Sequence, residues 1–498
     1  MKKIVWNISE SNVILLLEYS IIKNLKLKKC SKLKEGEDMP ETHLLQSRQT
    51  VKLGLIVLIK ELFPEESLKI AYTIGEGVFC RFKDTGISVR EVRQIELKLK
   101  EWILSDPNIE FLKLEDGYYH YRVEGNDIKM IYPCETSVKK IEPFTIIPYQ
   151  DGFIVNFKEA GKESATWIPP DKLSATYDKT QKWLKNIKLE LLRDVNNYIA
   201  SGATLKLIGM TEALHEKEIS DIADMILQRK TILRVLLISG ASSSGKTSFA
   251  QRLSTQLIVN GFNPVTLSLD DYFVDREKTP LDAKGNYDFD CLEALDLPFL
   301  NQQLSDLIDG KTVDTPIFDF VTGHRSTKTR KLHVGKDEIL VVEGIHALNP
   351  ALFTNVNRNV LFKVYITALY ELNIDLTNRI PSTEVRMIRR IVRGDRFRGT
   401  HPEETLKQWE NVRLGEYNNV FKFQEESDVM FNSSLLYEIN ALRPFAVEAL
   451  NKIEDDSPYV ETKERLLKLL SFCEPMDTSK IPFNSIMREF IGGSIYFD

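Results

Sequence analysis

Runs rich in apolar residues mark the predicted strands of this chain. ILRVLLIS (232–239) predicts a buried parallel strand, because a strand covered on both faces is apolar at nearly every position. VTLSLDDYF (265–273) and ILVVEGI (339–345) predict two more strands of the same sheet. Strands separated in this way by helical segments are typical of an α/β domain with a mainly parallel sheet, which we place at residues 229–450.

The first and second runs are separated by a helical pattern. Its apolar positions are Phe249, Leu253 and Leu257. Their spacing predicts one face of a helix that begins after the first strand, and Gly261 and Pro264 should stop it.

A connector of helices is predicted at residues 161–228. The stretches 179–202 and 211–230 both have helical periodicity, and Gly202 and Gly209 are expected to break it. The many charged side chains of these stretches indicate an exposed face.

The two ends of the chain have patterns of their own. Residues 1–40 include KNLKLKKCSKLKEGED, whose charges we interpret as a solvated loop, with contact to RNA as the alternative. Residues 451–498 combine an amphipathic helix, ETKERLLKLLSFC, with the aromatic tail REFIGGSIYFD, which should dock on a neighbouring domain.

Composition narrows the class of protein. A chain of 498 residues is too long for one core, so about two to four domains are expected. The net charge of −6 disfavours broad nucleic-acid binding. We find no signal peptide and no apolar run that could cross a bilayer, so we expect a cytoplasmic protein without a membrane partner. The five cysteines are scattered, which fits reduced thiols.

The loop after the first predicted strand carries the most specific motif. GASSSGKTS matches G-x-x-x-x-G-K-T between a strand and a helix, the context that a Walker A loop requires. Its backbone N–H groups can close around phosphate oxygens, Lys246 reaches the outer phosphates, and Thr247 can ligate Mg²⁺. The residues predicted to bind ATP or GTP are Gly240, Ala241, Ser242, Ser243, Ser244, Gly245, Lys246, Thr247 and Ser248.

Carboxylates follow the other two predicted strands. Asp270 and Asp271 end the second strand, and Glu343 lies near the end of the third. Because the carboxyl ends of parallel strands meet at one edge of a sheet, these acids should face the phosphates. Phosphoryl transfer needs a ligand for Mg²⁺, here Glu343 with Thr247, and a carboxylate that accepts a proton from the attacking hydroxyl. Adjacent side chains of an extended strand point to opposite faces, so Asp270 and Asp271 should differ in role.

Residues 378–399 are dense in arginine. The seven are Arg379, Arg386, Arg389, Arg390, Arg393, Arg396 and Arg398. Helical spacing places Arg386, Arg390 and Arg393 on one face, while Gly394 and Gly399 should loosen the chain that follows. We interpret the segment as a mobile lid that excludes water and neutralises charge on the transferring phosphoryl group. The alternative is a solvated basic helix.

The order and spacing of these motifs resemble the uridine kinase/phosphoribulokinase group of P-loop kinases. The matching pieces are GASSSGKTS, SLDDYF, YDFDCLEALD, PIFDFVTGHR, VVEGIHALN and RRIVRGDRFRG. The resemblance implies that Asp270 is the base for a nucleoside 5′-hydroxyl and that Asp290 binds the ribose hydroxyls. It also implies that the lid, ribose or phosphate contacts come from Arg390, Arg393, Arg396 and Arg398.

The acceptor pocket departs from the pattern of this family. Phe318 stands where uridine and cytidine kinases usually have tyrosine, and Gly323 replaces a base-reading histidine, with His324 beside it. A phenyl ring stacks on a pyrimidine but cannot donate a hydroxyl hydrogen bond. The motifs therefore specify the phosphoryl chemistry better than they specify the acceptor.

Residues 41–160 resemble a different family, the second additional, editing-associated domain of threonyl-tRNA synthetases, which is an α+β domain. The resemblance lies in a helix followed by the strand pattern around IGEGVFCRF. Arg48 and Lys52 stand where that domain has two histidines, and two cations cannot replace neutral imidazoles as metal ligands. We therefore expect a binding or packing module without zinc or editing hydrolysis. Nucleoside kinases with this fusion carry a ubiquitin-like domain before it, but residues 1–40 show no recognisable sign of one.

Three functions remain open from sequence. The first is ATP-dependent phosphorylation of uridine or cytidine in pyrimidine salvage, with Mg²⁺. The second is phosphorylation of a sugar phosphate or another small alcohol, and the third is a nucleotide-switched RNA-binding protein. Asp290 and the PIFDF loop favour a kinase, because a switch needs no acceptor pocket. We expect a nucleoside and a nucleoside triphosphate as partners, and leave a homo-oligomer open.

Overall fold

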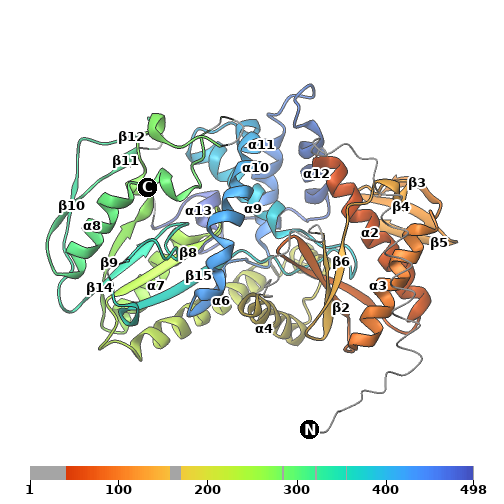
Figure 1. Cartoon of the computed structure of the whole chain (residues 1–498), viewed down its shortest axis with the longest axis horizontal. Helices are drawn as coiled ribbons and strands as arrows, with labels where there is room; N and C mark the ends of the chain where they lie inside the picture. Colours follow the sequence, from red (N-terminus) through yellow and green to blue (C-terminus); the bar gives the residue numbers. More distant parts are fainter. Residues whose placement is uncertain are drawn as a thin grey trace, which may run out of the picture.

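The computed structural model in Figure 1 describes most of the chain beyond residue 40. The described residues are 41–157, 170–282, 285, 287–319, 322–354 and 356–496. The loop predicted for residues 1–40 lies outside them. Three parts follow one another along the chain: an N-terminal α+β part, a helical connector and a parallel α/β part (Figure 1).

The N-terminal part contains two antiparallel sheets. The first has the order β1-β2-β7-β6, with strands Leu68–Ile74, Gly77–Phe82, Gly152–Asn156 and Thr145–Tyr149. The second has the order β3-β4-β5, with strands Ile109–Glu115, Tyr118–Val123 and Asn126–Met130. Two helices pack on each other beside them, α2 (Glu41–Leu62) and α3 (Val89–Leu104). Gly54 permits this packing, because a Cβ there would lie 2.4 Å from the Trp102 ring. This mixed α+β content confirms the predicted class of the N-terminal part.

The connector consists of three helices, α4 (Asp171–Ile187), α5 (Leu192–Ala200) and α6 (Thr204–Leu227). Gly202 breaks the chain as predicted, with a left-handed φ of 76°. The predicted break at Gly209 is wrong, because α6 continues through it. One interior glycine costs a helix only about 1 kcal/mol, and the buried face of α6 holds the helix together across it.

The third part is built on a five-stranded sheet with the order β16-β15-β8-β14-β9, and every neighbouring pair is parallel. The strands are β8 (Val235–Gly240), β9 (Asn263–Ser268), β14 (Glu338–Glu343), β15 (Leu361–Thr367) and β16 (Val429–Asn432). Central strand β8 is buried at every position, as its apolar run predicts. Pro264 lies within β9, and a proline is tolerated there because β9 is an edge strand. The parallel sheet confirms the predicted α/β class.

The third part also contains helices, which are labelled in Figure 1. They are α7 (Lys246–Val259), α8 (Leu297–Ile308), α9 (Ser382–Phe397), α10 (Pro402–Asn419), α11 (Glu438–Leu450), α12 (Val460–Ser471) and α13 (Arg488–Ile491). Two small strand pairs extend from it, β10 (Val313–Thr315) with β13 (Arg330–Leu332) and β11 (Phe318–Asp319) with β12 (His324–Arg325). No helix among the described residues is long and apolar enough to span a membrane.

The N-terminal part is bonded to the loop that precedes α9. The Ile70 N–H of β1 donates to Leu376 O at 2.9 Å, and Asn373 Nδ2 donates to Ile70 O at 2.8 Å. Asn378 Nδ2 donates to Lys129 O at 2.9 Å. These hydrogen bonds connect the N-terminal sheets directly to the segment that precedes the arginine-rich helix.

Candidate active site

The loop between β8 and α7 passes so close to neighbouring atoms that two of its positions have no room for a side chain. A Cβ at Gly240 would lie 2.3 Å from Ile366 O, and one at Gly245 would lie 2.6 Å from Ile486 Cγ2. Gly245 has a φ of 82°, in the left-handed region that favours glycine. Lys246 begins α7, and its Nζ donates to Ala241 O at 3.0 Å, so the ammonium folds back over the loop.

The ends of β9 and β14 bring two carboxylates together beside this loop. Ser268 is the last residue of β9, and its Oγ donates to Glu343 Oε1 at 2.8 Å. The same Oγ accepts the Asp270 N–H at 3.3 Å. One serine hydroxyl thus bonds the Glu343 carboxylate and the backbone of Asp270.

Lys246 and these acids influence one another strongly. Burial lowers the pKa of Lys246, and the negative charges of Glu343 and Asp270 oppose that shift. The pKa of Glu343 is raised, first by burial and then by the charge of Asp270. A cation is therefore favoured here, because it relieves the repulsion between the two carboxylates.

Asp270 and Asp271 do not lie on an extended strand. Strand β9 ends at Ser268, and both aspartates belong to a short 3-10 helix, Leu269–Tyr272, so the predicted strand alternation does not apply. They still differ in surroundings. The Asp271 carboxylate accepts the Phe318 N–H at 3.3 Å, and burial raises its pKa, whereas the charge of Asp270 acts on Lys246. Asp271 is bonded to the loop of the predicted acceptor pocket.

Asp290 reaches the same region from a loop. Burial raises its pKa to about 7, and the negative charge of Glu416 adds to the rise, while Arg390 and Lys246 oppose it. The loop packs closely on helix α10 at Gly415. Only glycine fits there, because a Cβ would lie 2.3 Å from Asp290 Cβ. The structure therefore brings Asp290 close to both the P-loop lysine and the arginine-rich helix.

The two residues predicted to read the base lie in different surroundings. The Phe318 ring is half-buried and packs on Phe273, with 5.7 Å between the ring centroids. His324 is exposed, and its ring nitrogens lie 3.7 Å from Asp275 and 3.6 Å from Glu277. The contacts of His324 are therefore with acids of a surface turn.

Helix α9 is packed against the P-loop. Four of its side chains donate to Ser242 or Ser243: Arg386 at 3.0 Å, Arg389 at 3.2 Å, Arg390 at 2.6 Å and Arg393 at 3.2 Å. Arg386 and Arg389 are buried. The interpretation of the whole segment as a mobile lid is therefore wrong for this half of the helix.

The last turn of α9 is more open. The helix continues to Phe397, so Gly394 does not loosen the chain as expected. Arg396 is exposed and lies 4.5 Å from the Phe445 ring, while Arg398 caps the helix. The neighbouring charge of Arg393 and burial lower the pKa of Arg398 to about 10.

Sequence reasoning missed the carboxylates that hold this arginine helix. Glu416 Oε1 accepts the Ser242 N–H at 3.0 Å and pairs with Arg386. Glu438 accepts from Arg389 at 2.6 Å, and Glu489 accepts from Arg393 at 2.8 Å. These glutamates follow the arginines in the chain by 30, 49 and 96 residues, so no local motif connects them.

Residues 235–435 match the model of the phosphoribulokinase/uridine kinase family. A uridine kinase of Ligilactobacillus salivarius (strain UCC118) is 29% identical over 179 residues, which cover 36% of this chain and 74% of that protein. A uridine kinase of Mycoplasma genitalium (strain ATCC 33530 / DSM 19775 / NCTC 10195 / G37) is 28% identical over 207 residues, 41% of this chain and 88% of the relative. Residues 235–435 form a phosphoribulokinase/uridine kinase family domain.

A solved structure is also similar to this kinase domain. The structure of a possible uridine kinase from Bacillus stearothermophilus is 22% identical and covers 43% of this chain and 98% of its own, with a TM-score of 0.30. The sheet order and the P-loop described above, rather than this likeness, define the fold of the kinase domain.

Thr247 and Glu343 are the residues of the kinase domain that could hold Mg²⁺. Mg²⁺ in such sites keeps several waters and takes one or two protein oxygens together with phosphate oxygens. The repulsion between the carboxylates of Glu343 and Asp270 fits a bound cation. Within the described residues, no group of three or more His, Cys, Asp or Glu side chains is placed to hold a metal ion without phosphate oxygens and water.

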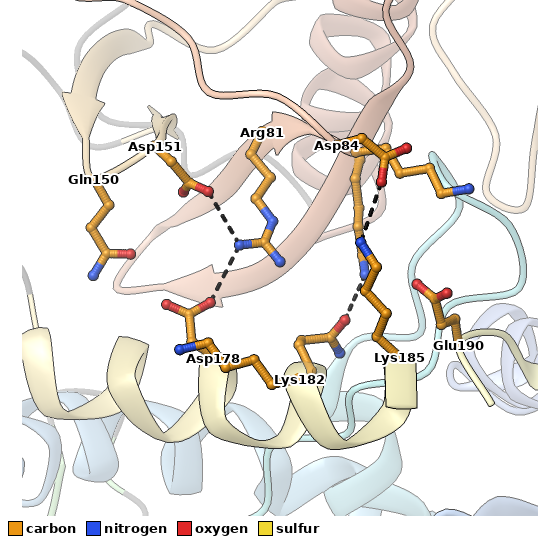
Figure 2. A pocket seen from close by; sticks show the side chains of 11 residues that line it. Arg81, Asp84, Gln150, Asp151, Asp178, Lys182, Lys185 and Glu190 are labelled. Atoms are coloured by element: carbon orange, nitrogen blue, oxygen red, sulfur yellow. Dashed lines mark hydrogen bonds and ion pairs between the residues drawn. The ribbon is translucent and has the colours of Figure 1, made fainter. Parts of the chain in front are cut away.

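A cavity of about 400 Å³ lies between the N-terminal part and α4 (Figure 2). Arg81 Nη1 lies 3.5 Å from Asp151 and 3.3 Å from Asp178. Lys69 is buried there, which lowers its pKa to about 8, and its Nζ donates to Gln181 Oε1 at 2.6 Å. No P-loop residue lines this cavity. Lys185 also pairs with Asp84, at 3.4 Å, so we interpret the cavity as a salt-bridged interface between the parts.

Proposed function

We propose that this protein transfers the γ-phosphate of ATP to the 5′-hydroxyl of a pyrimidine nucleoside, uridine or cytidine. The observation that carries the proposal is that Asp270 and Asp290 both interact electrostatically with Lys246 of the P-loop. In this proposal Asp270 is the proton acceptor, Asp290 binds the acceptor, and Lys246 holds the outer phosphates. The uridine kinases among the relatives support a nucleoside as the acceptor.

The mechanism assigns a separate task to each side chain. Asp270 accepts the proton of the attacking hydroxyl, and the P-loop amides and Lys246 hold the phosphates of ATP or GTP. Arg393 lies near Ser243 of the loop, where its guanidinium can neutralise charge that develops on the transferring group. Mg²⁺, held by Thr247 and Glu343, supplies further charge neutralisation when bound.

The acceptor site is proposed to consist of Asp290, which accepts hydrogen bonds from the ribose hydroxyls, and Phe318, which stacks on the base. Arg390, Arg396 and Arg398 complete the ribose and phosphate contacts in this proposal. A sugar phosphate or another small alcohol is the second candidate acceptor. The specific observation in its favour is that Phe318 has no hydroxyl and that His324 contacts Asp275 and Glu277.

We infer that the N-terminal part is a packing or binding module of the threonyl-tRNA synthetase editing type without editing hydrolysis. Arg48, at one predicted ligand position, donates to Glu142 at 2.9 Å and to Glu76 at 3.1 Å. Lys52, at the other, is a cation whose pKa burial lowers to about 8. Two cations cannot act as metal ligands in place of two neutral imidazoles, so we propose that this module holds no zinc.

A screen of acceptors tests the proposed function. The full chain is incubated with ATP, Mg²⁺ and a panel of nucleosides and sugar phosphates, and ADP formation is measured. Uridine or cytidine should raise ADP release well above the rate without an acceptor. Stimulation by ribulose 5-phosphate alone would favour the second candidate. An ATPase rate that responds to tRNA and to no small alcohol would favour the nucleotide-switched RNA-binding protein.

A further inference from the structure

A carboxylate from the far end of the chain lies at the first turn of the P-loop helix. Glu489 belongs to α13, and its side chain is only 8% exposed. Its Oε2 accepts the Ser248 hydroxyl at 2.8 Å and lies 3.4 Å from the Ser248 backbone nitrogen, which also donates to it. Its Oε1 accepts from Arg393 at 2.8 Å. Glu489 lies outside the stretch that matches the kinase family, residues 235–435.

These donors are the kind that bind phosphate. The Ser248 N–H is among the first four of α7, which have no partner within the helix, and the positive end of the helix dipole adds to it. A serine hydroxyl and a guanidinium complete an anion site of ordinary composition. A carboxylate and a phosphate oxygen require the same donors, and two anions cannot share them without strong repulsion.

Packing holds Glu489 in this place. Its neighbours Ile486, Met487 and Phe490 are fully buried. Ser485 Oγ donates to the buried Glu212 at 2.5 Å, and the Arg389 guanidinium lies 5.0 Å from the Phe490 ring. Because these contacts are buried, the backbone of the segment is held in place, and a phosphate at these donors would have to displace the Glu489 side chain.

The charge of Glu489 also acts beyond its hydrogen bonds. It is one of the negative charges that oppose the lowering of the Lys246 pKa by burial, and it adds to the rise in the pKa of Glu343. Glu489 therefore acts electrostatically on the P-loop lysine and on the carboxylate assigned to Mg²⁺.

We propose that Glu489 competes with nucleotide phosphate for the P-loop. Its ionised carboxylate takes the donors of Ser248 and Arg393, so a nucleoside di- or triphosphate must turn it away in order to bind. The competition weakens nucleotide binding and makes it depend on the charge at this one position. The inference rests on the proposed function only in that a nucleotide binds the P-loop.

The substitution Glu489→Gln tests this competition. Glutamine keeps an oxygen that accepts from Ser248 but removes the charge. Titration calorimetry on the full chain should show the Kd for ATP and for ADP falling about tenfold, the size expected when one charge-assisted competitor is removed. The Kd for adenosine, which has no phosphate, should stay the same. The thermal unfolding midpoint of the variant shows whether it is folded.

Glu474→Gln is the matched control, because it removes the same charge from an exposed side chain of the same C-terminal segment. It should leave all three affinities unchanged. Unchanged or weaker ATP binding in Glu489→Gln would overturn the inference, and so would an equal gain for adenosine or for the control. The titrations contain no acceptor. A failed nucleoside screen would therefore contradict the proposed reaction without contradicting the competition between Glu489 and nucleotide phosphate. If neither the parent chain nor the variant binds a nucleotide, the inference fails.

Discussion

At the scale of single residues, Asp270 and Asp271 are distinguished by their surroundings, since Asp271 accepts the Phe318 N–H and the charge of Asp270 acts on Lys246. If Asp270 accepts the proton of the acceptor, Asp270→Asn should lower kcat by about 10²–10⁴-fold, the usual worth of general-base catalysis. ATP affinity should change little, because Lys246 and the loop amides remain. Asp271→Asn removes the acceptor of the Phe318 N–H, so we expect a change in KM for the acceptor rather than a dead enzyme. Steady-state kinetics and a separate nucleotide titration measure both. A normal kcat in Asp270→Asn with an inactive Asp271→Asn would reverse the assignment.

Asp290 leads to a prediction of pH dependence at the same scale. Its pKa is raised to about 7, chiefly by burial, so the carboxyl is largely protonated below pH 7. The ionised form is the better acceptor for ribose hydroxyls, and kcat/KM for the nucleoside should therefore rise with pH through about 7. Asp290→Asn should lower kcat/KM and abolish this inflection. A variant profile that keeps the same inflection would assign it to another group.

At the scale of secondary structure, two helix glycines predict opposite outcomes. Nothing lies within 4 Å of a Cβ built at Gly209 of α6. Gly209→Ala should therefore stabilise the protein by about 0.5–1 kcal/mol, since alanine is the better helix former. Urea unfolding measures the gain. Any loss of stability would show that the exposed face of α6 has a contact that depends on this glycine.

Gly415 of α10 is the contrasting case. An added Cβ would lie 2.3 Å from Asp290 Cβ, so the loop that carries Asp290 must shift. We expect Gly415→Ala to raise the KM for the acceptor while leaving the Kd for ATP unchanged, because α10 would displace the acceptor carboxylate and not the P-loop. A variant with an unchanged acceptor KM would separate Asp290 from acceptor binding.

At the scale of the whole molecule, Asn378 joins the N-terminal part to the kinase domain. Its Oδ1 accepts the Ile131 N–H at 2.9 Å, and its Nδ2 donates to Lys129 O at 2.9 Å. Asn378→Ala leaves both backbone groups without this partner. Each group that water does not reach should lower the stability by about 1–3 kcal/mol. The free energy of unfolding should fall accordingly, and amide exchange around residue 131 should quicken. Asn359→Ala, at an exposed position, is the control and should change neither.

The fold was largely predictable because its signals are local. The apolar runs of β8 and β14, the glycines of the P-loop and the helical repeat of α7 each depend on neighbouring residues, so pattern alone located them. Gly209 shows the limit of such reasoning, since burial along α6 outweighs one weak helix former. The 3-10 turn at Asp270 shows it too, because β9 ends at Ser268 rather than at the aspartates.

The amino-acid sequence by itself determined the P-loop, the acids at the strand ends and the arginine-rich helix, since each motif is a short stretch whose chemistry depends on residue type and spacing. Only the tertiary structure decided which charges meet. Glu416, Glu438 and Glu489 pair with arginines of α9 across 30, 49 and 96 residues, and folding alone brings them together. The same folding buries half of a helix that the sequence predicted to be part of a mobile lid. Burial and pairing of charge depend on neighbours in space, and a linear pattern contains no information about them.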